Sequence, residues 1–171
     1  MAKKTNEEKN IFKQTRENLG LSRSAACDII KGMTEDRLEK IENGRTANVN
    51  PEDAFMLAEG YKEPYLCNYF CANMCRIGQQ YVPQIEPKEL PQIILETLAS
   101  LNALNKKKDR LVEIASDGSI TSTELDDFIQ IQNGLEKISI AVETLQLWVE
   151  KMLADGKIDT NEYEKRKNDL K

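Results

Sequence analysis

Apolar residues recur at intervals of three and four along most of the chain, and glycine or proline separates the stretches in which they do so. This spacing places apolar side chains on one face of a helix. Five short stretches of this kind fall within residues 5–78, and they predict five short helices that pack into one compact domain. The expected ends of these helices are Gly20, Gly32, Gly44, Gly60 and Gly78.

Capping residues mark where three of these helices begin. Ser22 and Thr34 each precede a periodic apolar stretch, and their hydroxyl oxygens can accept a hydrogen bond from an unpaired amide of the first turn. Asn50 is followed by Pro51, a residue favoured at the first position of a helix. We therefore expect helices to start directly after Ser22, Thr34 and Asn50.

Residues 79–91 interrupt the helical pattern. Pro83, Pro87 and Pro91 recur at every fourth position, and no apolar period runs through them. A proline-marked segment of this kind is typical of a semi-stiff linker. We therefore expect a boundary here between two domains.

Residues 92–171 predict a module of long helices, arranged as a coiled coil or a bundle. The first helix is expected from about Pro91 to Ala115. The second follows the capping residues at 121–124 and continues to about Leu153, and a short, mostly charged helix is expected at about 161–170. The chain as a whole is therefore expected to be all-α.

The second long helix carries a dimerisation seam. Its apolar positions follow steps of three and four for four heptads, the period of a coiled coil. At ~1.5 Å per residue this helix is roughly 48 Å long, more than the segments around it can cover. Exposing such a strip is unfavourable, so we expect a homodimer, the alternative being a three-helix bundle within a monomer. The seam residues are Leu125, Phe128, Leu135, Ile138, Val142, Leu145, Val149 and Met152.

Composition argues against an enzyme. The chain has no histidine among its 171 residues, so the commonest general base and metal ligand is absent. Neither a nucleophile–base pair nor a phosphate-binding loop is recognisable. We expect no catalytic activity and no cofactor.

The charge is distributed unevenly along the chain. The net charge is −5, yet residues 1–45 hold 10 basic and 8 acidic side chains, a balance of +2. The remaining residues therefore carry −7. This asymmetry favours the N-terminal part as the one that meets nucleic acid.

The sequence predicts a protein that stays in the cytoplasm. No apolar run approaches the ~20 residues of a membrane span. The polar N-terminal segment lacks the apolar core of a signal peptide. We expect no contact with a membrane, and reduced thiols at the four cysteines.

Residues 19–45 contain the most specific pattern in the chain. Leu-Gly-Leu-Ser at 19–22 opens one helix, Gly-Met-Thr at 32–34 separates it from the next, and Leu38 precedes Ile-Glu-Asn-Gly at 41–44. With this pattern the chain resembles the Cro/lambda-repressor (XRE) family of helix-turn-helix regulators, over roughly residues 8–75. The resemblance implies a five-helix, lambda-repressor-like domain whose helix after Thr34 enters the major groove of DNA.

The resemblance also implies which side chains meet double-stranded DNA. They belong to the start of the second helix, to the recognition helix and to the residue that follows it. These candidates are Arg23, Thr34, Glu35, Asp36, Arg37, Lys40 and Arg45.

Two features depart from the family pattern. The segment between Ser22 and Thr34 is one residue longer, and the recognition helix contains the acids Glu35, Asp36 and Glu39. Acids suit a helix N-terminus, and a carboxylate can accept a hydrogen bond from cytosine. Facing phosphates, however, they oppose binding. They favour an alternative function, that of an adaptor or antirepressor that keeps the fold and does not bind DNA.

Three cysteines form a stripe on the fifth predicted helix. Cys67, Cys71 and Cys75 recur at every fourth position, and neighbouring thiols could hold a soft metal or respond to oxidants. Cysteine is also a small apolar residue that packs well in helical cores. We expect core packing and no bound metal, with metal or redox chemistry as the alternative.

The sequence thus predicts a dimeric, sequence-specific DNA-binding transcriptional regulator, with repression as its expected mode of action.

Overall fold

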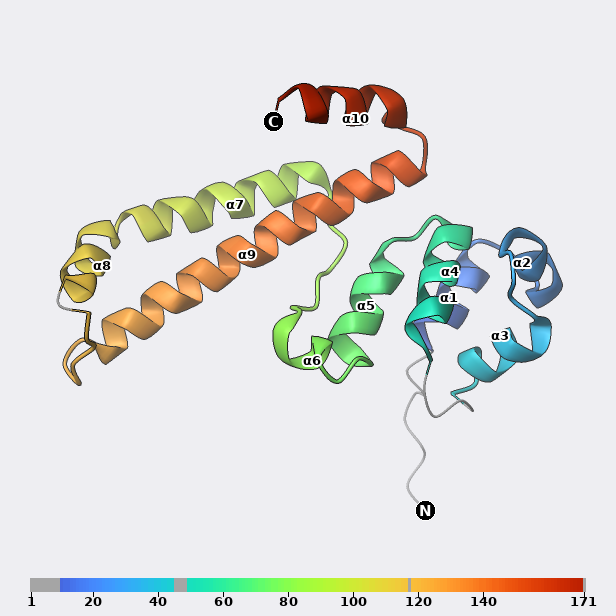
Figure 1. The fold of residues 1–171 in the computed structure, drawn as a ribbon, viewed down its shortest axis with the longest axis horizontal. Helices are drawn as coiled ribbons and strands as arrows, with labels where there is room; N and C mark the ends of the chain where they lie inside the picture. The colour runs from blue at the N-terminus through green and yellow to red at the C-terminus, as the bar shows by residue number, and fades with distance from the viewer. Residues whose placement is uncertain (1–9, 45–48, 117, 171) are drawn as a thin grey trace, which may run out of the picture. The chain divides into compact units, whose positions relative to one another are not determined.

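The computed structural model describes residues 10–44, 49–116 and 118–170 (Figure 1). All regular structure in these residues is helical, so the prediction of an all-α protein is confirmed. The expected domain start at residue 5 and the candidate DNA contact Arg45 lie outside the described residues. No helix in the described part of the chain combines the length and the apolarity needed to cross a bilayer.

The chain forms two compact units. The first contains the described residues up to Gln84 together with those from Glu150 onward, and the second is Ile85–Val149. The linker predicted at 79–91 contributes to both units: a short helix in it belongs to the first, and the buried side chain of Ile85 belongs to the second.

The first unit is built from short helices around one apolar core. Helices α4 and α5 lie against each other, α1 packs on α3 and α4, and α2 packs on α3. The core includes Phe12, Leu38, Leu57 and Leu66, each fully buried. The helices are α1 (Ile11–Asn18), α2 (Arg23–Ile29), α3 (Glu35–Glu42), α4 (Pro51–Tyr61), α5 (Tyr65–Asn73), α6 (Gly78–Tyr81) and α10 (Thr160–Asp169).

Three helices of this unit begin where the sequence predicts. The Ser22 side chain accepts a hydrogen bond from the amide of Ala25, and that of Thr34 accepts one from the amide of Arg37. Asn50 and Asp53 exchange side-chain and backbone hydrogen bonds in a reciprocal capping box. Each cap satisfies amides that have no partner within the helix.

Two glycines do not end helices as expected. Gly60 lies inside α4, which continues to Tyr61, and a Cβ on Gly60 would come within 2.4 Å of the buried side chain of Ile30. Gly78 begins α6, and a Cβ there would meet the carbonyl oxygen of Cys71 at 2.0 Å. Both positions require glycine because another part of the chain approaches closely.

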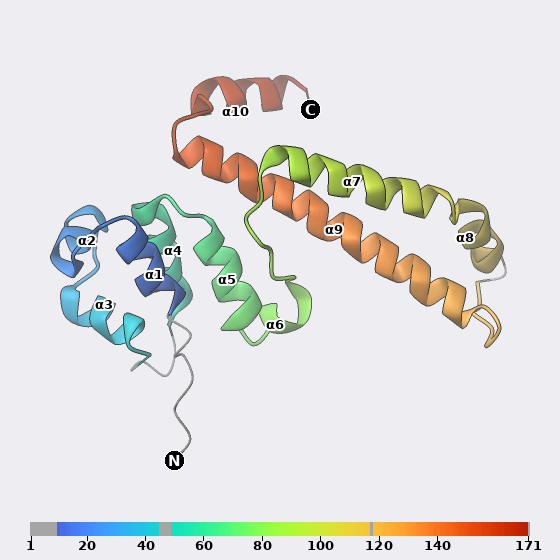
Figure 2. The ribbon, with the colours of Figure 1, turned by 180° about the vertical axis from the view of Figure 1, so that it is seen from behind.

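The second unit is an antiparallel helical hairpin, seen from both sides in Figures 1 and 2. Helices α7 (Leu90–Asn105) and α8 (Lys108–Ala115) run along α9 (Leu125–Ala154). The sequence predicts one helix from about Pro91 to Ala115, whereas the structure breaks it at Lys106 and Lys107. Beside the break, Lys107 donates to Gln130, and Arg110 lies 2.8 Å from a carboxylate oxygen of Asp127.

Candidate nucleic-acid interface

The turn between α2 and α3 is held from both sides by buried residues. Gly32 has φ +87°, a left-handed conformation that disfavours residues with a Cβ. The flanking side chains of Ile30 and Met33 lie in the core. The turn therefore holds α2 and α3 at a defined angle and leaves Lys31 exposed.

The N-terminal end of α3 faces away from the core. Leu38 and Ile41 are fully buried, whereas Thr34, Glu35 and Asp36 are exposed together with Lys40 one turn later. The exposed part of α3 thus holds two carboxylates, one ammonium group and one hydroxyl. It can offer both donors and acceptors to a partner.

Arg23, a predicted phosphate contact, belongs to a buried ion-pair network. The Glu42 carboxylate is fully buried, and Arg16 donates to both of its oxygens at 2.5 and 3.0 Å. Arg23 donates to the same carboxylate at 2.9 Å, and about a third of its side chain remains exposed. Burial opposes ionisation of Glu42, but the hydrogen bonds from Arg16 and Arg23 outweigh it and lower the pKa of Glu42.

Arg37 points toward α4 instead of outward. Its guanidinium makes two hydrogen bonds to the nearly buried carboxylate of Asp53. This interaction raises the pKa of Arg37, so the charge persists at any physiological pH. Because Asp53 also caps α4, Arg37 connects the exposed helix to the next one along the chain.

Lys40 is paired as well, but on the surface. Its ammonium nitrogen lies 2.5 Å from a carboxylate oxygen of Asp36, one turn earlier on α3. Exposed pairs at this spacing contribute only about 0.3–0.5 kcal/mol. Breaking the ion pair with Asp36 therefore costs little free energy, which leaves the Lys40 ammonium group able to pair with a phosphate instead.

One basic side chain near α3 was missed by the sequence analysis. Within the described residues 22–44, Arg23, Arg37 and Lys40 each have a carboxylate partner, and Lys31 has none. The sequence did contain a signal for Lys31, because it lies in the turn between Ile30 and Met33, whose side chains enter the core.

The structure divides the predicted dimer seam of α9 into two groups. Leu125, Leu135 and Val142 are about half exposed. The other five, Phe128, Ile138, Leu145, Val149 and Met152, are partly buried. The most buried residues of α9 are Ile131, Ala141 and Thr144, none of which belongs to the predicted seam. A second stripe of α9 therefore packs within the chain.

The cysteines pack against the core of the first unit. Cys27, Cys67, Cys71 and Cys75 are all partly buried and contact the core cluster. Burial raises the pKa of the Cys27 and Cys67 thiols, which lowers their thiolate fraction at neutral pH. Among the described residues, no group of three or more histidine, cysteine or acidic side chains is placed to hold a metal ion.

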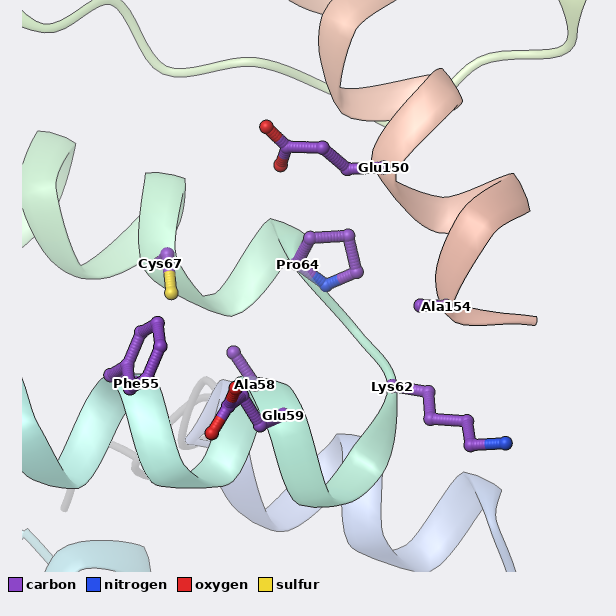
Figure 3. A pocket seen from close by; sticks show the side chains of 8 residues that line it. All are labelled: Phe55, Ala58, Glu59, Lys62, Pro64, Cys67, Glu150 and Ala154. Atoms are coloured by element: carbon purple, nitrogen blue, oxygen red, sulfur yellow. The ribbon is translucent and has the colours of Figure 1, made fainter. Parts of the chain in front are cut away.

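A pocket of about 430 Å³ lies in the first unit, and no residue of α3 lines it. Figure 3 shows Phe55 and Cys67 on the α4–α5 side of it and Glu150 on the last turns of α9. None of the predicted DNA contacts lines this pocket.

Comparisons with protein-family models, with curated proteins and with solved structures found no match for this chain.

Proposed function

We propose that this protein is a sequence-specific, double-stranded-DNA-binding transcriptional regulator, in first place a repressor, that acts as a homodimer and not as an enzyme. In this proposal α2 and α3 are a helix-turn-helix unit of the Cro/lambda-repressor type. The observation that carries it is the α2–α3 turn. Left-handed Gly32, between the buried side chains of Ile30 and Met33, leaves the N-terminal end of α3 open to a partner.

In this proposal the exposed residues at the start of α3 contact the edges of the bases. The Thr34 hydroxyl can donate to or accept from a base edge, and the carboxylates of Glu35 and Asp36 can accept from the amino group of cytosine. Lys31 and Lys40 are the cations able to reach phosphates, the first without an ion-pair partner among the described residues and the second with an exchangeable one. Arg37 then serves chiefly to hold α3 on α4.

A specific observation favours a second candidate function. Three of the four basic side chains in residues 22–44 are paired with carboxylates, and Glu35 and Asp36 stand exposed beside them. A surface of this kind suits a basic protein partner better than a polyphosphate. The second candidate is therefore an adaptor or antirepressor that binds a protein through α3.

Selection of bound sites from a random pool of duplex DNA tests the first function. The selected site is then titrated at several salt concentrations with the wild type, with Lys31→Ala/Lys40→Ala, and with Lys108→Ala/Lys137→Ala as a control of equal charge in the second unit. We expect the first variant to bind more weakly. Its slope of log affinity against log salt should fall by ~0.9 for each phosphate that the variant no longer neutralises, while the control retains nearly the wild-type slope.

Two outcomes would contradict DNA binding at α3. One is a selection that enriches no sequence and a protein that is not retained on duplex DNA at low salt. The other is equal weakening in both lysine variants, which would indicate a general charge effect. Retention of a basic protein partner that is abolished in Glu35→Gln/Asp36→Asn would then support the adaptor.

A further inference from the structure

The hairpin of the second unit has a well-defined internal seam. Ile93 on α7 and Ile131 on α9 are both 1% exposed. Farther along, the Leu104 side chain lies over Gly134, with its Cδ1 atom 3.9 Å from the place a Cβ would take. These residues identify the sides of the two helices that face each other.

A second apolar stripe runs beside this seam on each helix. On α7, Ile94, Leu98 and Leu101 are between 42% and 53% exposed. On α9, Leu135 and Val142 are 47% and 46% exposed. Each of these residues follows a seam position by one residue, which turns its side chain by about 100° around the helix.

The two stripes lie on the same side of the hairpin. Both helices are right-handed, and they run antiparallel (Figure 1). Viewed along the hairpin, a step of one residue therefore turns clockwise on one helix and anticlockwise on the other, so both stripes come to one face. We call this face, made of Ile94, Leu98, Leu101, Leu135 and Val142, the hairpin face.

The opposite side of the hairpin carries charged as well as neutral polar groups. It carries Gln92 and Glu96 on α7, where Glu96 lies 2.7 Å from the ammonium nitrogen of Lys88. On α9 the corresponding positions hold Gln130, Asn133 and Lys137, followed farther along by the partly buried Ile140 and the buried Thr144. By the same one-residue step, Gln132, Ser139 and Gln146 of α9 also lie on the hairpin face. The face is therefore uncharged, and its apolar side chains stand beside neutral polar ones.

We propose that a second copy of this chain covers the hairpin face, so that two hairpins form a four-helix bundle with α7 and α9 contributed by each subunit. This proposal rests on the dimer of the proposed function, and it assigns α7 an equal part in the interface. Two-fold symmetry places the same face of each subunit against the other. A face without charged groups satisfies that condition, because no like charges then meet across the two-fold axis.

The area of the face agrees with this occupant. The length of the face is limited by α7, whose 16 residues span roughly 24 Å at ~1.5 Å per residue. Two packed helices are about 20 Å across. Face-to-face pairing therefore buries roughly 500 Å² on each subunit, or about 1,000 Å² in total, which matches the lower limit of ~1,000 Å² for a specific interface.

Sedimentation equilibrium of the full chain without DNA tests the proposal. The wild type should have a mass of about 39 kDa, twice the 19.5 kDa of one chain. Leu98→Lys/Leu101→Lys on α7 and Leu135→Lys/Val142→Lys on α9 should each raise the dissociation constant of the dimer at least ~100-fold. Leu95→Lys is the control, because Leu95 is 69% exposed but points away from α9 and lies outside the hairpin face.

Circular dichroism shows whether each variant keeps its helices. If the α7 lysine variant loses helix content, Leu98→Ala/Leu101→Ala replaces it, with a smaller but measurable rise in the dissociation constant. A dimer that survives every α7 substitution but dissociates in the α9 variant would overturn the proposal in favour of pairing through α9 alone. A wild type that is monomeric at micromolar concentration would also overturn it. Because no DNA is present, neither result depends on whether α3 binds DNA.

Discussion

At the residue scale, Glu42 is the centre of a buried ion-pair network in the first unit. Its fully buried carboxylate accepts hydrogen bonds from Arg16 on α1 and Arg23 on α2, while Arg16 also donates to the carbonyl oxygen of Leu21 at 2.6 Å. One network thus joins the first three helices. The desolvation of these charges is compensated only while every partner is present.

Removing the charge of Glu42 should therefore be costly. We expect Glu42→Gln to lower the free energy of unfolding by about 3 kcal/mol or more, because Arg16 then remains buried beside a neutral amide. Urea unfolding followed by circular dichroism measures this change. Glu59→Gln, at an exposed position of α4, is the control and should change stability by less than about 0.5 kcal/mol. Equal effects of the two substitutions would refute the network.

The same carboxylate should make the stability of the first unit depend on acid. The pKa of Glu42 lies below its usual value of 4.5 in the folded protein. Its stabilising contribution is therefore complete above pH 4.5 and is lost as the pH falls through the folded pKa. Urea unfolding is measured for both proteins between pH 7 and pH 3. The difference in free energy of unfolding between the wild type and Glu42→Gln should shrink below pH 4.5. An advantage that stays constant to pH 3 would contradict this linkage.

At the element scale, close approach between helices decides where glycine is required. Gly60 and Gly134 are both interior to helices, α4 and α9. A Cβ on Gly60 would collide with Ile30, whereas a Cβ on Gly134 would make an ordinary contact with Leu104. The backbone of α4 therefore approaches the end of α2 more closely than α9 approaches α7.

Alanine at these two positions should have opposite effects. We expect Gly60→Ala to destabilise the first unit by about 1–3 kcal/mol through overpacking. Gly134→Ala should stabilise α9 by about 0.5–1 kcal/mol, because alanine loses less conformational freedom in a helix. Thermal unfolding of both variants gives the comparison. A stabilising Gly60→Ala would show that Ile30 moves aside without cost.

At the scale of the whole molecule, dimerisation and DNA recognition are expected to be coupled. A helix-turn-helix dimer reads two half-sites about 34 Å apart. The hairpin face belongs to the second unit and the exposed end of α3 to the first. The proposed dimer interface and the proposed DNA-binding surface can therefore be changed independently.

Leu135→Lys/Val142→Lys should accordingly weaken binding to the selected DNA site by at least ~10-fold while affinity for a single half-site stays unchanged. The physical reason is that the second, linked half-site is bound at high effective concentration only in the dimer. Fluorescence anisotropy with full-site and half-site duplexes measures both affinities. If the dimer dissociates and full-site affinity persists, pairing serves a purpose other than DNA recognition.

The helical class and the starts of α2, α3 and α4 could be predicted from the residue pattern alone. Caps at Ser22, Thr34 and Asn50 act within three residues, and apolar periodicity repeats within one or two turns. Such interactions form between neighbours in the chain, so they can be read without knowing the fold. The burial of Leu38 and Ile41, which turns Thr34 and Asp36 outward, follows from the same local period.

The partners of the charged and apolar groups, in contrast, follow from contacts between residues far apart in the chain. Arg37 and Asp53 are 16 positions apart and Arg16 and Glu42 are 26 apart, distances over which the spacing of residue types carries no signal. The same holds for α9, where Ile131 and Ala141 are buried although the predicted seam does not include them. Leu135, which belongs to the predicted seam, remains about half exposed. The side of α9 that is covered depends on where α7 lies, and α7 is a separate helix some 40 residues earlier in the chain.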